Sequence, residues 1–428
     1  QLAFNKINPG GNFELKDQSF FDKEYEKEFK KNRLINQVIL LKELDATKYS
    51  KDILKHLQLF SALCLTIGLS GCGNQQTTSD SSEEAGTPSS ENETVSKKES
   101  GLPTFSLAWS EYPSWSIFGV AHVDGFINGK EGELGPIEEK WKVDIVLREA
   151  DYDTCITMYG AGQVDAACLT NMDSLNPSIG RRSTMILPTS TSHGADACIV
   201  VDSVNSIEDL KGKKVYGLEK SVSEYCFVRS LENAGHKEKD FSFSNMDPSA
   251  ASAAMQQKQA DVEAIMVWNP FVLETLSKRS DVKVLFDSTG IPAEIIDSVI
   301  MAQDSLNKEG GEAFASAIAE TFYTVAARMN QPETRDATLT ALGEKFSGLD
   351  LAAMNNVVRQ TKFLTSPGEA IALFNGQELP QIMDRVVSFC VDHEITGRAP
   401  ILSYGKTEKD NKAELRFDPS YIQNSSSQ

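Results

Sequence analysis

The sequence predicts an α/β fold for residues 104–422, and three observations lead to this class. Apolar runs of four to seven residues alternate with longer segments of helical period, which is the pattern of strands and helices in α/β proteins. Two segments, Gly162–Ala166 and Lys258–Val262, each place Gln and Asp at an expected helix-to-strand transition, as two lobes built on one plan would. The length of 428 residues leaves room for two domains at about 100–200 residues each.

The individual elements follow from apolar periodicity. We expect strands, in chain order, at Phe105–Trp109, Val143–Leu147, Ala166–Leu169, Thr184–Leu187, Ala197–Val201, Lys214–Gly217, Ala264–Trp268, Val282–Phe286 and Ser298–Ala302. We expect helices at Trp115–Asn128, Thr154–Ala161, Ser223–Ala234, Ala250–Gln257 and Gly311–Arg328. In the last of these, Phe314, Ile318 and Phe322 share one face, which predicts packing against a core. After about residue 330 the pattern is mostly helical, and residues 423–428 form a Ser-rich tail.

The composition excludes several classes of partner. The chain carries 61 acidic and 42 basic side chains, a formal net charge of −19. Nucleic-acid phosphates and acidic membranes both attract clustered Lys and Arg, so this balance argues against either surface as a partner. No uncharged apolar run reaches 18 residues, so we expect no membrane-spanning helix. The seven cysteines include no CxxC pair, and we expect no bound metal and no cofactor.

The first hundred residues of the chain differ in amino-acid composition from the rest. Residues 1–50 are polar and charged, and because no Met precedes Met158 we treat them as an extension of doubtful status. Residues 73–103 are rich in Ser, Thr, Gln, Asn and Glu and nearly lack apolar side chains. Such a segment cannot bury enough surface to offset its ordering entropy, so we expect a disordered linker there.

Residues 51–72 have the organisation of a secretory signal. Lys51 and Lys55 precede a short apolar stretch at 57–68, and the segment ends in Leu-Ser-Gly-Cys at 69–72. This end resembles the lipobox of bacterial lipoproteins, which implies that Cys72 is lipidated and becomes the first mature residue. A buried helix with a chance cysteine is the alternative.

Further motifs carry a resemblance to one family. The segment Ser206–Val215 is similar to the one that opens the second lobe of periplasmic-type solute-binding proteins, most closely the nitrate/sulfonate/taurine group of ABC importers. The turn of the first lobe in that group is similar to Gly162–Ala166, and its later landmarks are similar to Gln259–Asp261, Val267–Phe271 and Phe417–Tyr421. The resemblance covers about residues 104–422.

This resemblance implies a two-lobed periplasmic-binding-protein fold of type II. It places the crossover strands near Cys198–Val201 and Ile296–Ile300, so that lobe 1 is 104–198 plus 299–422 and lobe 2 is 199–298. A small solute would lie between the lobes and pass to a permease and an ATPase subunit. The protein would be a monomer in the cell envelope, outside the cytoplasm and held to the membrane by its lipid.

Ligands of open α/β sheets lie beyond the carboxyl ends of the strands, which selects five loops. The candidate ligand-binding residues in them are Trp109, Ser110, Tyr112, Trp115, Thr170, Asn171, Ser192, His193, Ser221, Ser223, Trp268 and Asn269. Several have a structural alternative: Trp109 and Trp268 suit a core, Ser110, Ser221 and Ser223 suit helix caps, and His193 suits a polar hydrogen-bonding role.

The charge of these loops bears on the ligand. Lys220 is their single basic residue, whereas Glu111 and Asp196 offer carboxylates that are either ligand partners or ordinary loop charges. Nitrate and sulfonate binders would be expected to present Arg or Lys. We therefore expect a small nitrogen-containing solute, zwitterionic or cationic; taurine-like or amine-bearing solutes fit, and bare nitrate fits poorly.

Two rival functions stay open. A pyrimidine synthase of thiamin-precursor metabolism shares this fold, but the cysteine-rich iron-binding run of that family is missing here. HExxH, GxSxG, SxxK and the ATP-binding GxxxxGK[ST] are missing as well, so we expect no enzyme and no catalytic residue. A ligand-sensing lipoprotein is the other rival. Buried free thiols are expected at Cys155, Cys168, Cys198, Cys226 and Cys390. Cys168 and Cys198 both lie on predicted strands of lobe 1, and a disulfide between them is the alternative.

Overall fold

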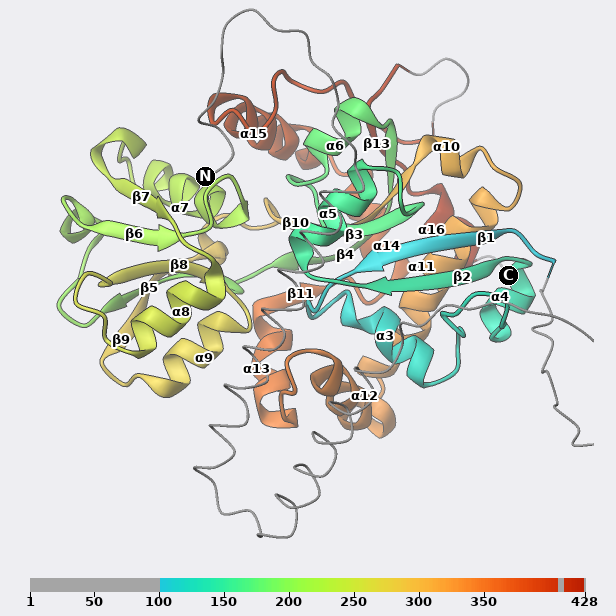
Figure 1. Ribbon diagram of the computed structural model, residues 1–428, viewed down its shortest axis with the longest axis horizontal. Helices are drawn as coiled ribbons and strands as arrows, with labels where there is room; N and C mark the ends of the chain where they lie inside the picture. The colour runs from blue at the N-terminus through green and yellow to red at the C-terminus, as the bar shows by residue number, and fades with distance from the viewer. Residues whose placement is uncertain (1–100, 407–411, 427–428) are drawn as a thin grey trace, which may run out of the picture. The chain divides into compact units, whose positions relative to one another are not determined.

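The computed structural model describes residues 101–406 and 412–426 (Figure 1). The proposed extension, signal segment and lipidation site at Cys72, and nearly all of the proposed linker, lie outside the described residues. Among the helices that are described, none combines the length and the apolar character needed to cross a membrane.

The first sheet contains eight strands in the order β12-β13-β4-β10-β3-β1-β2, with β11 also paired to β4 (Figure 1). The strands are β1 Thr104–Trp109, β2 Asp144–Glu149, β3 Ala166–Thr170, β4 Ser183–Ser192, β10 Ile296–Ala302, β11 Thr361–Phe363, β12 Leu402–Tyr404 and β13 Leu415–Phe417. Strand β1 is parallel to β2 and β3, whereas β10 runs antiparallel between β3 and β4. Every residue of β4 and β10 is buried, so these two strands form the centre of this part of the chain.

The second sheet contains five strands in the order β7-β6-β8-β5-β9. They are β5 Asp196–Val201, β6 Lys214–Gly217, β7 Ser242–Asn245, β8 Ala264–Trp268 and β9 Val282–Asp287. Strand β6 is parallel to β7 and β8, and β5 runs antiparallel to β8 and β9. Two sheets with one antiparallel strand placed between parallel ones repeat the same plan, as the paired helix-to-strand motifs predict.

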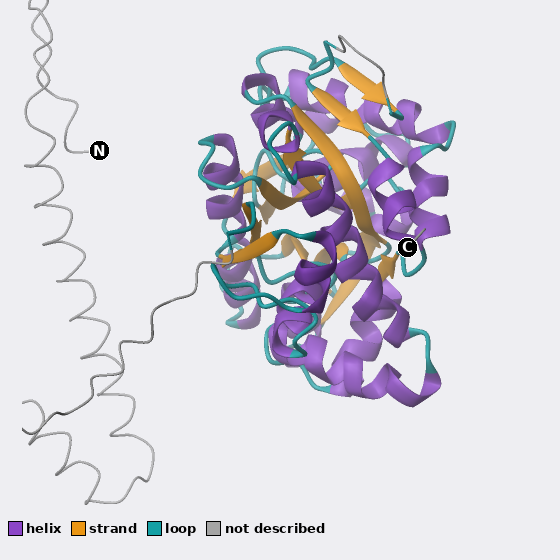
Figure 2. Ribbon diagram, turned by 90° about the vertical axis from the view of Figure 1, so that its right-hand side faces the viewer, coloured by secondary structure: helices purple, strands orange, loops and turns teal. Residues whose placement is uncertain are grey.

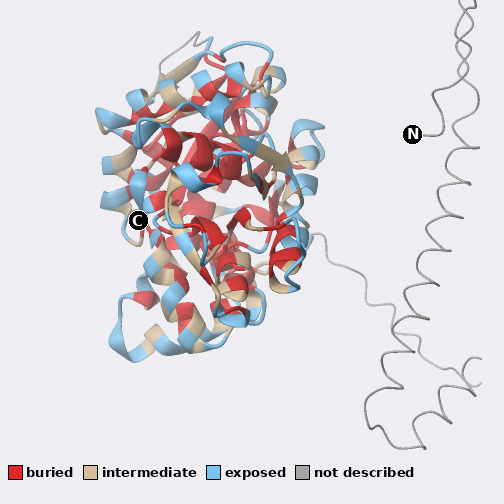
Figure 3. Cartoon of the chain, turned by 90° about the vertical axis from the view of Figure 1, so that its left-hand side faces the viewer, coloured by how far each residue is buried: buried red, intermediate tan, exposed pale blue. Residues whose placement is uncertain are grey.

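Helices cover both faces of each sheet (Figures 1 and 2). One core of the first sheet includes residues of α3 Ser116–Val123, α4 Pro136–Trp141, α11 Gly311–Met329, α12 Pro332–Lys345, α13 Leu351–Gln360 and α16 Ser420–Ser426. A second core joins both sheets through α5 Tyr152–Gly160, α6 Leu175–Gly180, α7 Val222–Asn233 and α15 Glu378–Asp392. A third lies under α8 Pro248–Gln256 and α9 Phe271–Lys278. The short helix α10 Gln303–Leu306 follows β10, and α14 Pro367–Phe374 contributes to the first two cores. Figure 3 shows these buried residues inside an exposed outer surface.

The chain passes between the sheets twice. It leaves β4 at Ser192 and enters β5 at Asp196, and it returns between Asp287 and Ile296 through the 3₁₀ turn η3 Ser288–Gly290. Both passages come slightly earlier than the crossover positions expected from the sequence. Strand β5 belongs to the second sheet from its first residue, and β10 belongs to the first sheet from Ile296.

The nine expected strands are all present, and the structure differs from the expectation at element ends and by four additional short strands. The helix expected at 115–128 ends at Val123 as α3, because Asp124 caps it and Gly125 adopts a positive φ of 74°. Strand β4 continues to Ser192 through polar residues, since its Ser and Thr side chains are buried and hydrogen-bonded rather than exposed. Strands β7, β11, β12 and β13 are three or four residues long and were not expected.

Candidate functional site

A cavity of about 580 Å³ lies where the loops of both sheets meet. Its walls come from the segments after β1, β2 and β3, from β10, and from the N-terminal ends of α7, α8 and α9. This volume falls within the range of about 300–1,000 Å³ that small-molecule sites occupy. The carboxyl ends of the strands therefore converge on a space suited to a small solute.

The structure brings half of the sequence-predicted site residues to this cavity. Six of them line it: Ser110, Tyr112, Trp115, Thr170, Ser221 and Trp268. Trp268 is half-buried at the end of β8, where it packs against the core that joins both sheets and also lines the cavity. Ser221 also caps α7, because its hydroxyl oxygen accepts the Ser223 N–H at 3.1 Å. Its two predicted roles are therefore compatible.

Three predicted residues are part of the protein interior instead, which corrects the expectation for them. Trp109 is 2% exposed and packs under Gly119 in the core. The side chain of Asn171 donates to the Glu294 carbonyl and accepts the Ile296 N–H, both at 3.0 Å, so it fastens the return crossing to β3. Ser223 is fully buried one residue inside α7.

The other three predicted residues flank the crossing from β4 to β5 without lining the cavity. Ser192 donates to Asp196 at 2.6 Å and therefore positions a residue that does line it. His193 is exposed, and its backbone N–H donates to the Gln360 carbonyl at 2.8 Å. The Asn269 amide donates to the Gln360 side chain at 2.9 Å across the two sheets. These residues organise the crossing and do not face a solute.

Three aromatic rings form one wall of the cavity. The rings of Tyr112 and Trp115 are 4.7 Å apart and tilted by 46°, and Trp115 stacks on Tyr152 at 5.5 Å and 18°. The Tyr152 hydroxyl donates to Asp173 at 2.6 Å, and Thr170 donates to the same carboxylate oxygen at 2.7 Å. These bonds fix the Tyr152 ring, a cavity residue that its position at the start of α5 did not reveal.

Carboxylates dominate the polar part of the lining. The eight acidic lining residues are Glu111, Glu149, Asp151, Asp153, Asp196, Asp247, Glu274 and Asp297. No Lys, Arg or His of the described residues lines this cavity. Six of the acids are exposed or half-buried, while Asp196 and Asp297 are 2% and 1% exposed. The field in the cavity therefore favours a positive charge.

Asp196 has one carboxylate oxygen held by the protein and one that is not. Its Oδ2 accepts the Ser192 hydroxyl, whereas its buried Oδ1 has no hydrogen-bond partner among the described residues. Burial raises the pKa of Asp196 to about 7, against the lowering effect of the Ser192 hydrogen bond. A buried polar atom without a partner calls for an explanation, and in a residue that lines a cavity a ligand donor would supply the missing hydrogen bond.

Asp297 lies on β10 and is positioned by a chain of hydroxyls. Ser190 donates to its Oδ2 at 2.5 Å and lies 2.8 Å from the Ser114 hydroxyl, which in turn lies 2.9 Å from the Thr189 hydroxyl. Burial and the nearby charge of Asp196 raise the pKa of Asp297 to about 8, although the Ser190 hydrogen bond acts in the opposite direction. Burial also raises the pKa of Tyr112, which interacts with Asp297.

The described cysteines show no sign of a reactive thiolate. Cys155, Cys168, Cys198, Cys226 and Cys390 are all buried and free, as the sequence predicts. Burial raises the pKa of Cys155 and of Cys390 to about 12, and it raises the pKa of the other three as well. A thiol acts as a nucleophile only as the thiolate, so these five residues have a structural role.

Comparison with known proteins identifies a similar family. Residues 139–335, which include β3, both crossings and the second sheet, match the model of the family described as NMT1/THI5 like. This segment is therefore similar to the NMT1/THI5-like family. The similarity agrees with the nitrate/sulfonate/taurine relationship that the sequence motifs indicate.

Curated relatives cover only part of the chain. A protein of Brucella abortus (strain 2308), provisionally named a binding protein, is 29% identical over 174 residues, which are 40% of this chain and 52% of the relative. A protein of Escherichia coli K12, provisionally named an aliphatic sulfonates-binding protein, is 32% identical over 99 residues, 23% of this chain and 30% of the relative. The chain thus spans about half the length, or less, of these relatives.

Solved structures of the same fold align with a larger share of this chain than the curated relatives do. The periplasmic aliphatic sulphonate binding protein SsuA of Escherichia coli aligns with a TM-score of 0.56 and 18% identity over 69% of this chain and 94% of that one. A periplasmic sulfonate-binding protein from Methylobacillus flagellatus aligns with a TM-score of 0.57 and 15% identity over 76% and 94%. The NMT1/THI5-like segment is therefore part of a two-lobed periplasmic-binding-protein fold of type II, as expected from the sequence.

Proposed function

We propose that this protein is the extracytoplasmic solute-binding component of an ABC uptake system, and that it captures a small organic cation between its two sheets. The observation that supports this most is the acidic cavity, with eight carboxylates and no basic side chain in its lining. The family and the fold support the binding role, because the structural relatives are periplasmic binding proteins.

The cavity offers a cation two kinds of contact. The free Oδ1 of Asp196 and the carboxylate of Asp297 would accept N–H groups or face a fixed positive charge. The rings of Trp115, Trp268 and Tyr112 would supply cation–π contact within about 6 Å of a ring centre. Aromatic rings together with carboxylates are the combination by which proteins recognise ammonium and amidinium groups.

A simple sulfonate fits this cavity poorly, although the structural relatives are sulfonate-binding proteins. A sulfonate would have to enter a lining with six exposed or half-buried carboxylates and no basic side chain among the described residues to neutralise them. Like charges in a low-dielectric cavity repel strongly. The proposed solute is therefore a protonated or quaternary nitrogen compound. A zwitterion, which carries one negative group beside its positive one, is the most anionic solute that the proposal admits.

Titration calorimetry on the full chain tests this proposal. A panel of one quaternary ammonium compound, one protonated aminopyrimidine, taurine and methanesulfonate separates cations, a zwitterion and an anion. We expect heat from a cation, and we expect D196N to weaken its binding about tenfold or more by removing a buried charged partner. D202N is the matched control, because Asp202 is exposed and outside the cavity lining. Heat from methanesulfonate alone would contradict the proposal.

Capture without conversion separates a receptor from an enzyme of the same fold. Mass spectrometry of the solute after incubation with excess protein should recover it unchanged. A converted product would support the synthase alternative and would overturn the receptor role.

We further propose that the protein is held to the membrane by a lipid on Cys72 and delivers its solute to a permease coupled to an ATPase. The support is the Leu-Ser-Gly-Cys segment at 69–72 after an apolar stretch. Cells fed a radiolabelled fatty acid should label the wild-type chain and leave C72A unlabelled. Equal labelling of both chains would contradict the anchor.

A further inference from the structure

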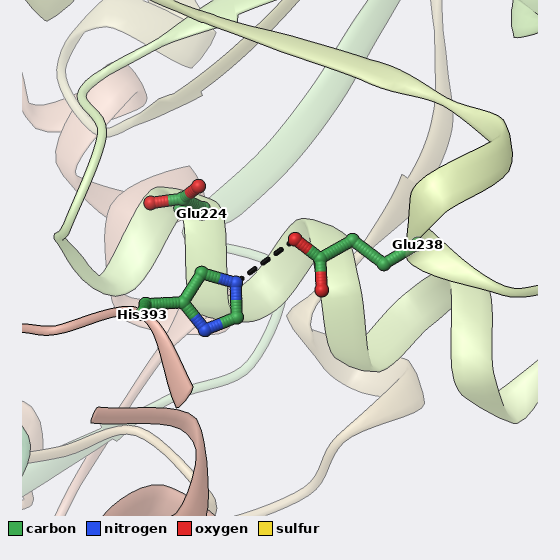
Figure 4. A group of neighbouring side chains, drawn as sticks. All are labelled: Glu224, Glu238 and His393. Atoms are coloured by element: carbon green, nitrogen blue, oxygen red, sulfur yellow. Dashed lines mark hydrogen bonds and ion pairs between the residues drawn. The ribbon is translucent and has the colours of Figure 1, made fainter. Parts of the chain in front are cut away.

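Three side chains that are far apart in the sequence meet on the side of α7. Glu224 lies in the first turn of α7, Glu238 begins the 3₁₀ turn η2 Glu238–Asp240, and His393 caps the end of α15 (Figure 4). One potential ligand atom from each lies within 4.8 Å of the other two. None of the three lines the solute cavity, so the proposed solute site does not account for them.

The hydrogen bonds of His393 determine which nitrogen faces the carboxylates. Nδ1 lies 3.0 Å from the Phe389 carbonyl oxygen, so Nδ1 carries a proton and donates it there. Nε2 lies 2.9 Å from Oε1 of Glu238. A neutral imidazole held in this way presents a lone pair to a carboxylate, which is repulsive unless a positive charge lies on Nε2 or between the two groups. Histidines that bind metals have the same arrangement, with the second nitrogen bonded to a carbonyl or carboxylate.

Glu224 adds a second negative charge to the same place. It is 9% exposed, and its Oε2 accepts the backbone N–H of Lys220 at 2.5 Å. A single proton on His393 balances only one of the two carboxylates, whereas a divalent ion balances both.

We propose that Glu224, Glu238 and His393 bind a divalent transition-metal ion, and that Zn²⁺ is the ion this ligand set suits best. Zn²⁺ takes imidazole nitrogen and carboxylate oxygen at about 2.0–2.2 Å and is commonly four-coordinate, so three protein ligands leave one position for water. The ligand atoms of a tetrahedral Zn²⁺ site lie about 3.4 Å apart. The ligand atoms of Glu224, Glu238 and His393 lie within 4.8 Å of one another, so side-chain rotations that move these atoms by about 1 Å would form the site.

The ion would join parts of the protein that belong to different sheets. Glu224 and Glu238 come from the segment of the second sheet, while α15 packs on β3 and β10 through the core that joins both sheets. Tyr225 and Phe389 already meet edge to face at 5.2 Å beside the cluster. Ser221 and Val222, at the start of the same helix as Glu224, line the solute cavity. Bound metal would therefore fix the helix end that forms one cavity wall.

Titration of ZnCl₂ into the chelator-treated full chain tests the site by calorimetry. We expect one saturable site, a higher melting temperature with Zn²⁺ because the ion binds only the folded chain, and the visible absorption of four-coordinate Co²⁺ when CoCl₂ replaces ZnCl₂. H393Q should lower the Zn²⁺ affinity about tenfold or more and abolish the Co²⁺ band.

A matched variant removes another His–Glu pair. His236 lies 3.3 Å from Glu208, and both residues belong to the second-sheet segment. H236Q should leave Zn²⁺ binding unchanged. E238Q provides a second test should H393Q fail to fold, since Glu238 is exposed. The proposal fails when no saturable Zn²⁺ binding is seen, when H393Q binds as tightly as H236Q, or when the melting temperature responds to pH and not to Zn²⁺.

Discussion

At the scale of single residues, Asp196 and Asp297 hold their protons at pH values where an exposed aspartate is charged. Burial raises their pKa values to about 7 and about 8, from a usual value of 3.8. The hydroxyls of Ser192 and Ser190 supply one hydrogen bond to each carboxyl group, which does not replace the water that each has lost. A cation in the cavity would supply the missing charge. The two residues therefore connect solute binding with proton release.

The stability of the unliganded protein should fall as the pH rises through this range. Between about pH 4 and pH 8 the unfolded chain has lost protons that folded Asp196 and Asp297 still hold, so rising pH favours unfolding until both are ionised. Urea unfolding across this range should show the decline, and D297N should make it shallower, because asparagine has no proton to lose. D202N should retain the wild-type slope. A slope unchanged in D297N would show that Asp297 ionises normally.

The affinity for a cation should change in the opposite direction. Bound positive charge favours the ionised carboxylates, so binding displaces their protons and tightens as the pH rises from about 6 to about 8.5. Calorimetry in two buffers with different ionisation enthalpies should detect protons released to the buffer. The release should be smaller in D196N. Binding without proton release at pH 6.5 would mean that the two groups are already charged in the free protein.

At the scale of elements, the local pattern of apolar residues predicts the strands that are buried along their length. It misses the short strands that form only because they pair with a strand distant in the sequence. Strand β8 reads as an apolar run and appears as expected. Strand β11 has three residues and exists because it pairs with the polar end of β4, which no local pattern indicates. The cavity residues divide in the same way, into those that the local sequence predicts and those that the pairing of distant strands places there. Trp115 follows directly from the loop after β1, whereas Asp297 reaches the cavity only because β10 returns between β3 and β4.

A substitution at Gly217 would test whether β6 and β8 approach too closely for a side chain to fit between them. A Cβ at this position would lie 2.6 Å from the Met266 carbonyl oxygen and 2.7 Å from the Phe243 ring. G217A should therefore lower the free energy of unfolding by about 1–3 kcal/mol, because strand backbone and ring must both shift. Chemical denaturation provides the measurement. G368A is the control: its added Cβ meets nothing within 4 Å in α14, so it should be neutral or stabilising. Equal effects would show that β6 tolerates a side chain there.

At the scale of the whole molecule, the crossings, the shared core and the ion pairs place the two sheets in one arrangement. Glu294, in the return crossing, accepts from Arg229 of α7 at 2.9 Å and pairs with Arg385 of α15 at 3.2 Å. Asn269 reaches Gln360 from the opposite sheet. The first turn of α7 contributes Val222 to the cavity and Glu224 to the group with Glu238 and His393. Solute and metal would thus both act on one helix end.

The net charge should speed the capture of a cation. The chain carries −19, and the cavity concentrates eight carboxylates, so its potential attracts cations from solution. Stopped-flow fluorescence, with Trp115 and Trp268 as reporters in the cavity, should show an association rate that falls as NaCl is raised toward about 0.15 M, where the screening length is about 8 Å. E274Q should lower the rate at low salt, because Glu274 lines the cavity. E131Q removes the same charge at an exposed position outside the lining and should have a smaller effect. A rate independent of salt, or equal effects of both variants, would mean that the arrangement of the carboxylates does not steer the solute.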